Sequence, residues 1–272
     1  MMTPLRNALK SATALAGFFA TSLALIPTEA SSQTMPACPA TGSLTNFASY
    51  TSGCMGTPEV YGITFYEMGL CTNDPMGSGT LDKSTCTASF EDSTGIYKDI
   101  AGTSVELGAG TGGVRPPNGT YKYAYAIISN TFRLRGNYAT SSQNYYSSSD
   151  YSDGSSNVTA GATSLAQEFE DNLTTFGGSS CTTTGSETFS NGTMTAYVLT
   201  SDLAVASGCT GVSRLIGYMT LNTPLKIGST TEGIKMTFKV ANSGMSVMPS
   251  SDGSSVFALA SGPFSASFTV IE

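Results

Sequence analysis

The side chains that could act as catalytic nucleophiles in this chain have no base to activate them. A Ser or Cys nucleophile needs a neighbouring group that takes its proton, and this group is most often His. The 272-residue sequence contains no His, and neither G-x-S-x-G nor S-x-x-K occurs in it. The sequence therefore predicts neither a Ser/His or Cys/His enzyme nor a His-ligated metal site.

Carboxylates offer a route to catalysis that needs no His. Glycoside hydrolysis can use two Asp or Glu residues as acid and base. The sequence does not indicate which carboxylates would face each other, and it has no Trp, the best aromatic platform for a sugar ring. We therefore expect that the protein is not an enzyme, with a carboxylate-based hydrolase as the residual alternative.

A polar stretch over residues 139–157 is rich in Ser and Tyr and lacks apolar periodicity, so we interpret it as a surface insertion. Its candidate binding residues are Tyr145, Tyr146, Asp150, Tyr151 and Asp153. Tyr supplies amphipathic contact area with few torsions, and Asp oxygens beside a Gly turn suit a hard cation such as calcium. The spacing departs from the EF-hand pattern, so an ordinary polar loop without a cofactor is the favoured interpretation.

Residues 108–113 match the pattern G-x-G-x-x-G, which binds a pyrophosphate where it joins a strand to the start of a helix. Pro116 and Pro117 follow here, and they cannot continue such a helix. We therefore interpret this segment as a flexible loop and expect no nucleotide cofactor.

Residues 1–30 have the layout of a cleavable secretory signal peptide. Arg6 and Lys10 precede a mostly apolar run, and the small residues Thr28 and Ala30 precede a polar segment. The apolar run is shorter than the roughly 20 residues that span a membrane, and no later segment is long and apolar enough to do so. The sequence therefore predicts a secreted protein, extracellular or at the cell surface, without a membrane span after cleavage.

All six Cys lie beyond the predicted signal, and an even number of Cys in an oxidising compartment favours disulfides. Their spacing forms two close pairs and one later pair. It suggests the disulfides Cys38–Cys54, Cys71–Cys86 and Cys181–Cys209. A metal or redox site is disfavoured because no C-x-x-C occurs.

The net charge narrows the possible partners. The chain has 12 basic and 19 acidic residues. Removal of residues 1–30 takes away two of the basic residues and one of the acidic residues, which leaves a formal charge of −8. Such an acidic surface disfavours nucleic acids and anionic lipids as partners. We expect self-association, or binding to a surface glycan or protein.

Most of the chain after residue 30 has the alternation of strands. Strand patterns cover residues 58–70, 95–107, 120–130, 193–205, 214–221, 226–228, 233–240 and 264–271. The segments 226–228 and 233–240 flank a short polar turn and predict a hairpin.

One segment has a different period. Residues 163–176 place Leu165, Phe169, Leu173 and Phe176 at steps of four and three, which predicts an amphipathic helix. Gly177 and Gly178 would end it.

These elements predict one domain over residues 31–272. The expected fold is an all-β, antiparallel β-sandwich, jelly-roll or immunoglobulin-like (Ig-like), stapled by disulfides and with one short amphipathic helix. No internal repeat divides the chain.

The last strand pattern suggests a structural role. Its apolar residues alternate as Phe264, Ala266, Phe268 and Val270. Such a strand can complete its own sheet or the sheet of a neighbouring subunit, and the first possibility is favoured. Export, low charge and the lack of catalytic groups then predict a self-assembling subunit of an extracellular filament, sheath or surface layer. The alternative is an adhesin-like module that binds a glycan or a protein.

Overall fold

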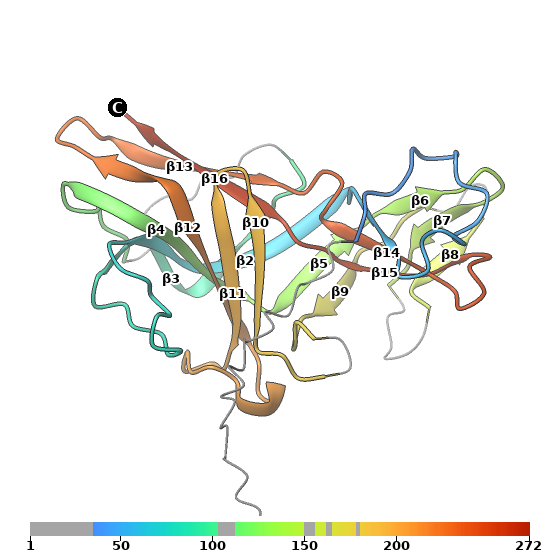
Figure 1. Ribbon diagram of the computed structural model, residues 1–272, viewed down its shortest axis with the longest axis horizontal. Helices are drawn as coiled ribbons and strands as arrows, with labels where there is room; N and C mark the ends of the chain where they lie inside the picture. The colour runs from blue at the N-terminus through green and yellow to red at the C-terminus, as the bar shows by residue number, and fades with distance from the viewer. Residues whose placement is uncertain (1–34, 103–111, 150–155, 162–164, 178–179) are drawn as a thin grey trace, which may run out of the picture. The chain divides into compact units, whose positions relative to one another are not determined.

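Long strands dominate the structure, as the alternation of apolar and polar side chains requires. The computed structural model describes residues 35–102, 112–149, 156–161, 165–177 and 180–272 (Figure 1). Ladders between its named strands are antiparallel throughout. The predicted all-β antiparallel class is therefore confirmed, whereas the jelly-roll or Ig-like form stays a prediction. The predicted signal peptide lies outside the described residues.

The strands have the following bounds: β1 (Cys54–Gly56), β2 (Val60–Cys71), β3 (Cys86–Asp99), β4 (Gly119–Ser129), β5 (Thr131–Arg135), β6 (Asn137–Ala139), β7 (Asn144–Ser147), β8 (Val158–Ala160), β9 (Phe169–Asn172), β10 (Thr184–Phe189), β11 (Gly192–Leu199), β12 (Arg214–Ile227), β13 (Gly233–Lys239), β14 (Met245–Pro249), β15 (Val256–Ser261) and β16 (Ser265–Ile271). A short 3-10 helix, η1 (Ser207–Cys209), precedes β12.

The largest sheet has eight strands, in the order β10-β11-β12-β4-β2-β5-β9, and β3 also pairs with β2. Strands β4 and β5 follow each other along β2, because Phe65 is opposite Ile128 and Gly62 is opposite Arg133. Strand β12 pairs with β4, and strand β9 pairs with β5. Gly62, Arg133 and Glu170 therefore form a row across β2, β5 and β9.

Strand β9 lies where the sequence predicted a helix over residues 163–176, and this prediction is wrong for the described residues 165–176. Phe169 is opposite Leu134, and Glu170 is opposite Arg133. The first pair joins apolar side chains on one face and the second joins opposite charges on the other, although the next residue, Asp171, is opposite Phe132. These cross-strand pairs outweigh the local helical spacing.

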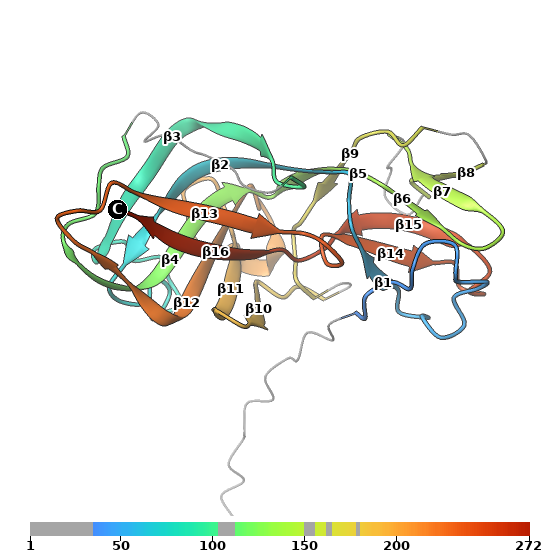
Figure 2. The ribbon, with the colours of Figure 1, turned by 90° about the horizontal axis from the view of Figure 1, so that it is seen from above.

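A two-stranded sheet of β13 and β16 packs on one face of the large sheet, which we call the inner face (Figure 2). Ring centroids of Phe65 and Phe238 lie 5.5 Å apart, and those of Tyr61 and Phe264 lie 5.8 Å apart. The predicted hairpin between residues 226–228 and 233–240 is wrong, because β13 pairs with β16 while the end of β12 pairs with β4.

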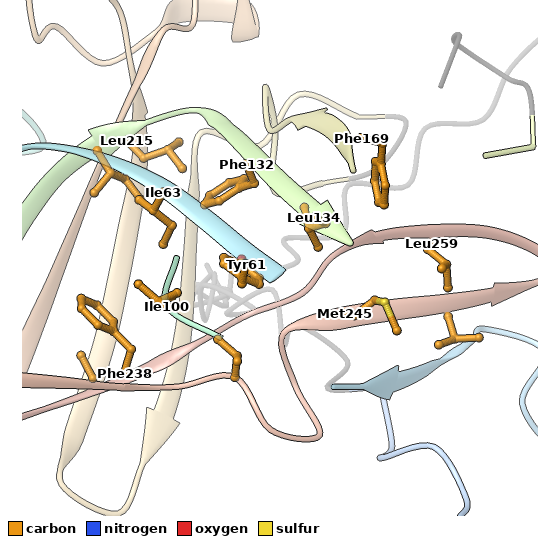
Figure 3. Packing of buried hydrophobic residues seen from close by; sticks show 14 of the residues in the cluster. Tyr61, Ile63, Ile100, Phe132, Leu134, Phe169, Leu215, Phe238, Met245 and Leu259 are labelled. Atoms are coloured by element: carbon orange, nitrogen blue, oxygen red, sulfur yellow. The ribbon is translucent and has the colours of Figure 1, made fainter. Parts of the chain in front are cut away.

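The hydrophobic core continues from the inner face to two three-stranded sheets, β1-β14-β15 and β6-β7-β8. Figure 3 shows this continuity, with Tyr61 and Leu134 beside Met245 and Leu259. The fully buried Asn157 connects the two small sheets: its Nδ2 donates to Leu259 O at 2.7 Å, and Leu259 N donates to its Oδ1 at 2.9 Å. The amide side chain thus substitutes for a strand partner at β15.

Three disulfides join Cys38 to Cys54, Cys71 to Cys86 and Cys181 to Cys209, the pairs that the spacing suggested. The Cys71–Cys86 bond connects the end of β2 to the start of β3 and closes the intervening loop. Among the described residues, no helix has the length and hydrophobicity to cross a membrane. The three disulfides are compatible with an extracellular protein.

Tyr61 makes stability sensitive to alkaline pH. Its hydroxyl is buried and donates to Gly262 O at 2.7 Å. Burial, and then the nearby Asp171, raise the pKa of Tyr61 above its ordinary value. The unfolded chain releases this proton near pH 10 while the folded chain keeps it, so stability falls as pH rises above about 10, by up to about 1.4 kcal/mol per pH unit. In urea unfolding, Tyr61→Phe should lose less stability than the wild type between pH 9 and 11.5. Equal losses would contradict this assignment.

Candidate functional site

The structure separates the residues that the sequence suggested for a binding loop. Tyr145 is buried in the core, and Tyr146, the next residue of β7, is half-buried. Asp150, Tyr151 and Asp153 lie outside the described residues. Within the described ranges, no group of three or more Cys, Asp or Glu residues is placed to hold a metal ion. The predicted insertion at 139–157 is partly built into β7, so it is not wholly a surface loop.

The four apolar residues of the C-terminal strand pattern face the large sheet. Ala266 is buried, and Phe264, Phe268 and Val270 are half-buried and contact the core. Strand β16 pairs with β13 of its own chain. Beyond β16, Asn191 Nδ2 donates to Ala266 O at 2.8 Å, so a side chain reaches the edge of β16 that lies away from β13.

A row of small residues crosses the inner face of the large sheet, and we call this row the inner trough. It consists of Ala126, Gly217 and Ala196, which are opposite one another on β4, β12 and β11 and are all half-buried. A Cβ at Gly217 would meet only Met194 Sδ, at 3.5 Å. A cavity of about 30 Å³ lies where this row meets Phe268 and the other side chains of the β13–β16 sheet. The β13–β16 sheet thus leaves small side chains of the large sheet incompletely covered.

The opposite face of the large sheet, the outer face, carries paired charges. Arg133 Nη2 lies 3.1 Å from Glu170 Oε1, and Arg135 Nε lies 3.2 Å from Glu59 Oε2. Arg135 Nη1 also lies 4.0 Å from Glu168 Oε1. These carboxylates are half exposed and each has an Arg partner. The prediction that the protein is not an enzyme stays a prediction, and its residual alternative, a carboxylate-based hydrolase, has no residue pair assigned to it.

Tyr97 lies among these charges. It is 44% exposed, and Arg133 Cζ lies 5.6 Å from its ring centroid. Burial, Glu168 and Asp99 raise the pKa of the Tyr97 hydroxyl, which, like any Tyr hydroxyl, can donate a hydrogen bond at neutral pH. A hollow of about 700 Å³ opens at β9 next to this group, and its lining includes Arg133, Glu168 and Glu170.

A second pair of an arginine and a tyrosine lies on the same face. The Arg214 guanidinium is 3.6 Å from the ring centroid of Tyr66, close enough for a cation–π contact. The outer face therefore combines Tyr rings, arginines and carboxylates over β2, β3, β5, β9 and β12.

Glu67 is the buried charge of the large sheet, with 7% of its surface exposed. Lys83 Nζ donates to both of its carboxylate oxygens, at 2.9 and 2.7 Å, and Tyr125 Oη donates to Oε1 at 2.5 Å. Burial, and then the hydrogen bond to Glu67, raise the pKa of Tyr125. Lys83 belongs to the loop closed by Cys71–Cys86, so this cluster anchors that loop to the sheet.

The sequence analysis missed the outer-face residues because their strands are far apart in the chain. A partial signal was present: residues 132–135 alternate apolar with basic side chains, and residues 168–170 alternate acidic with apolar ones. Complementary alternation of this kind predicts paired strands. No family model, curated protein or solved structure matches this chain.

Proposed function

We propose that this protein is a secreted structural subunit that associates with further copies of itself in an extracellular filament, sheath or surface layer. The inner trough beside β16 is the observation that supports this proposal. Strand addition between subunits is an established mode of assembly, and it needs a strand edge next to apolar surface. Both features occur together at β16, where the added strand would replace the hydrogen bond from Asn191 Nδ2 to Ala266 O.

The position of β16 defines how a second copy would bind. The β13–β16 sheet covers the inner face with two strands, whereas the large sheet below it has eight. A strand from a second copy, placed along β16 over Ala126, Gly217 and Ala196, would pair with the edge of β16 and bury these side chains. The burial of apolar area would drive association.

Further support comes from the chemistry of the chain. The disulfides suit a protein exported to an oxidising compartment. The sequence has no His and no nucleophile motif that would indicate an enzyme. A structural role accounts for both properties.

Filling the inner trough should prevent assembly without unfolding the monomer. In Gly217→Val, the new side chain has room beside Met194 and is suited to a strand, yet it occupies the space that an added strand needs. We expect the oxidised wild type to form filaments, tubes or sheets as its concentration rises, and Gly217→Val to remain monomeric. Light scattering and negative-stain electron microscopy measure both.

A matched control is Gly228→Val, because a Cβ at Gly228 meets no atom within 4 Å and this position lies outside the inner trough. This variant should assemble like the wild type. A wild type that stays monomeric at all concentrations would refute the proposal. Assembly of Gly217→Val to the wild-type extent would refute the role of the trough.

A further inference from the structure

We propose that the outer face binds a neutral saccharide, with the ring of Tyr97 as the platform for one sugar ring and Arg133 and Glu170 as partners of its hydroxyl groups. This function goes beyond self-association. It uses the face of the large sheet opposite the inner trough, so each proposal can fail without the other.

The position of Tyr97 is set by Gly62 on the neighbouring strand. A Cβ at Gly62 would lie 2.3 Å from Tyr97 Oη and 2.5 Å from Cε2, so the ring occupies the space above this glycine. Aromatic side chains commonly cover a strand glycine in this way. Tyr97 remains 44% exposed, so part of its side chain faces solvent while β2 supports it from below.

The groups beside the ring supply what a sugar needs. A sugar ring has an apolar C–H face, which packs on an aromatic ring, and hydroxyls at its rim, which both donate and accept hydrogen bonds. Arg133 offers donors and Glu170 offers acceptors, and both side chains are half exposed, at 53% and 55%. Their mutual ion pair at 3.1 Å orders both side chains in advance, which lowers the entropic cost of binding.

The charge of this face selects the type of saccharide. In the group of charges near Tyr97, Arg133 and Arg135 are outnumbered by Glu59, Glu168 and Glu170, and the chain as a whole carries a net charge of −7. An acidic sugar would be repelled by the excess carboxylates, whereas a neutral sugar loses nothing by their presence. Aromatic area with balanced donors and acceptors therefore points to neutral hexose or N-acetylhexosamine chains.

Titration calorimetry of the oxidised wild-type protein should detect binding to at least one of four neutral probes, namely maltohexaose, cellohexaose, mannohexaose and chitohexaose. Hexagalacturonate serves as the acidic comparison. Tyr97→Ala should raise the dissociation constant at least about tenfold, as loss of a central aromatic contact does. Tyr97→Phe keeps the ring and should bind within a few-fold of the wild type.

The matched control is Tyr146→Ala, which removes a half-buried Tyr from β7 in a different sheet and should leave binding unchanged. Lack of binding to all four neutral probes would overturn the proposal, as would tighter binding of hexagalacturonate. Unchanged binding by Tyr97→Ala would also overturn it. If Tyr97→Ala does not fold, Arg133→Gln decides the matter, because it leaves the ring in place and should weaken binding several-fold.

Discussion

Replacing Phe65 by Ala should lower the free energy of unfolding by about 3–5 kcal/mol. Phe65 is fully buried at the centre of the inner face, and its ring lies 5.5 Å from that of Phe238 on β13. The substitution removes the contact with Phe238, one of the contacts between the large sheet and the β13–β16 sheet. Phe65 also lines the existing cavity of about 30 Å³, so the lost volume would enlarge that cavity. We therefore expect that partial collapse does not offset the loss, and that the cost lies in the upper part of the range.

Urea unfolding of the oxidised protein measures this loss. The matched control is Phe257→Ala on β15, where the side chain is 42% exposed and the change should stay within about 0.5 kcal/mol. Similar losses in the two variants would contradict the assignment of Phe65 to the core between the sheets.

The strands could be predicted from the sequence where alternation is long and one face is buried. The segment 120–130 and the segment 264–271 are such cases, and both contain strands at those positions. Disulfide pairing followed from spacing because Cys38–Cys54 and Cys71–Cys86 are close in the sequence, which leaves Cys181 and Cys209 for the bond that encloses β10 and β11. Local pattern was sufficient wherever local contacts decide the structure.

The errors occurred where partners distant in sequence decide the structure. Residues 165–176 have helical spacing, yet pairing of Glu170 with Arg133 and of Phe169 with Leu134 favours a strand. The same holds for β13, whose partner is β16 rather than the adjacent end of β12. The register between distant strands is set by which side chains become buried together. The local spacing of apolar residues carries no information about these distant partners.

The candidate sites depend on register even more strongly. Tyr97 is opposite Thr64 of β2. This register places it on the outer face, next to Gly62 and Arg133. By contrast, Tyr145 and Tyr146 are adjacent in the sequence, and alternation directs one into the core and leaves the other half-buried. A count of tyrosines in a polar segment could not distinguish these cases.

Replacing Glu67 by Gln should cost about 2–3 kcal/mol, because it breaks a buried charge pair from one side. Lys83 donates to both carboxylate oxygens, and the amide group of Gln would present N–H to the ammonium group in place of one of them. Lys83 is 38% exposed and can partly recover its hydration, which keeps the expected cost at the lower end of the range for buried pairs. Urea unfolding at neutral pH measures this cost.

The matched control is Glu59→Gln, which removes one carboxylate from an exposed pair with Arg135 and should cost at most about 1 kcal/mol. The double variant Glu67→Gln/Lys83→Met removes both charges and should recover part of the stability, because no unpaired ammonium group then faces the amide. If Glu67→Gln costs no more than Glu59→Gln, the cluster does not anchor the loop between Cys71 and Cys86. A larger cost, recovered in part in the double variant, would show that the charge pair between Glu67 and Lys83 holds this loop on the outer face.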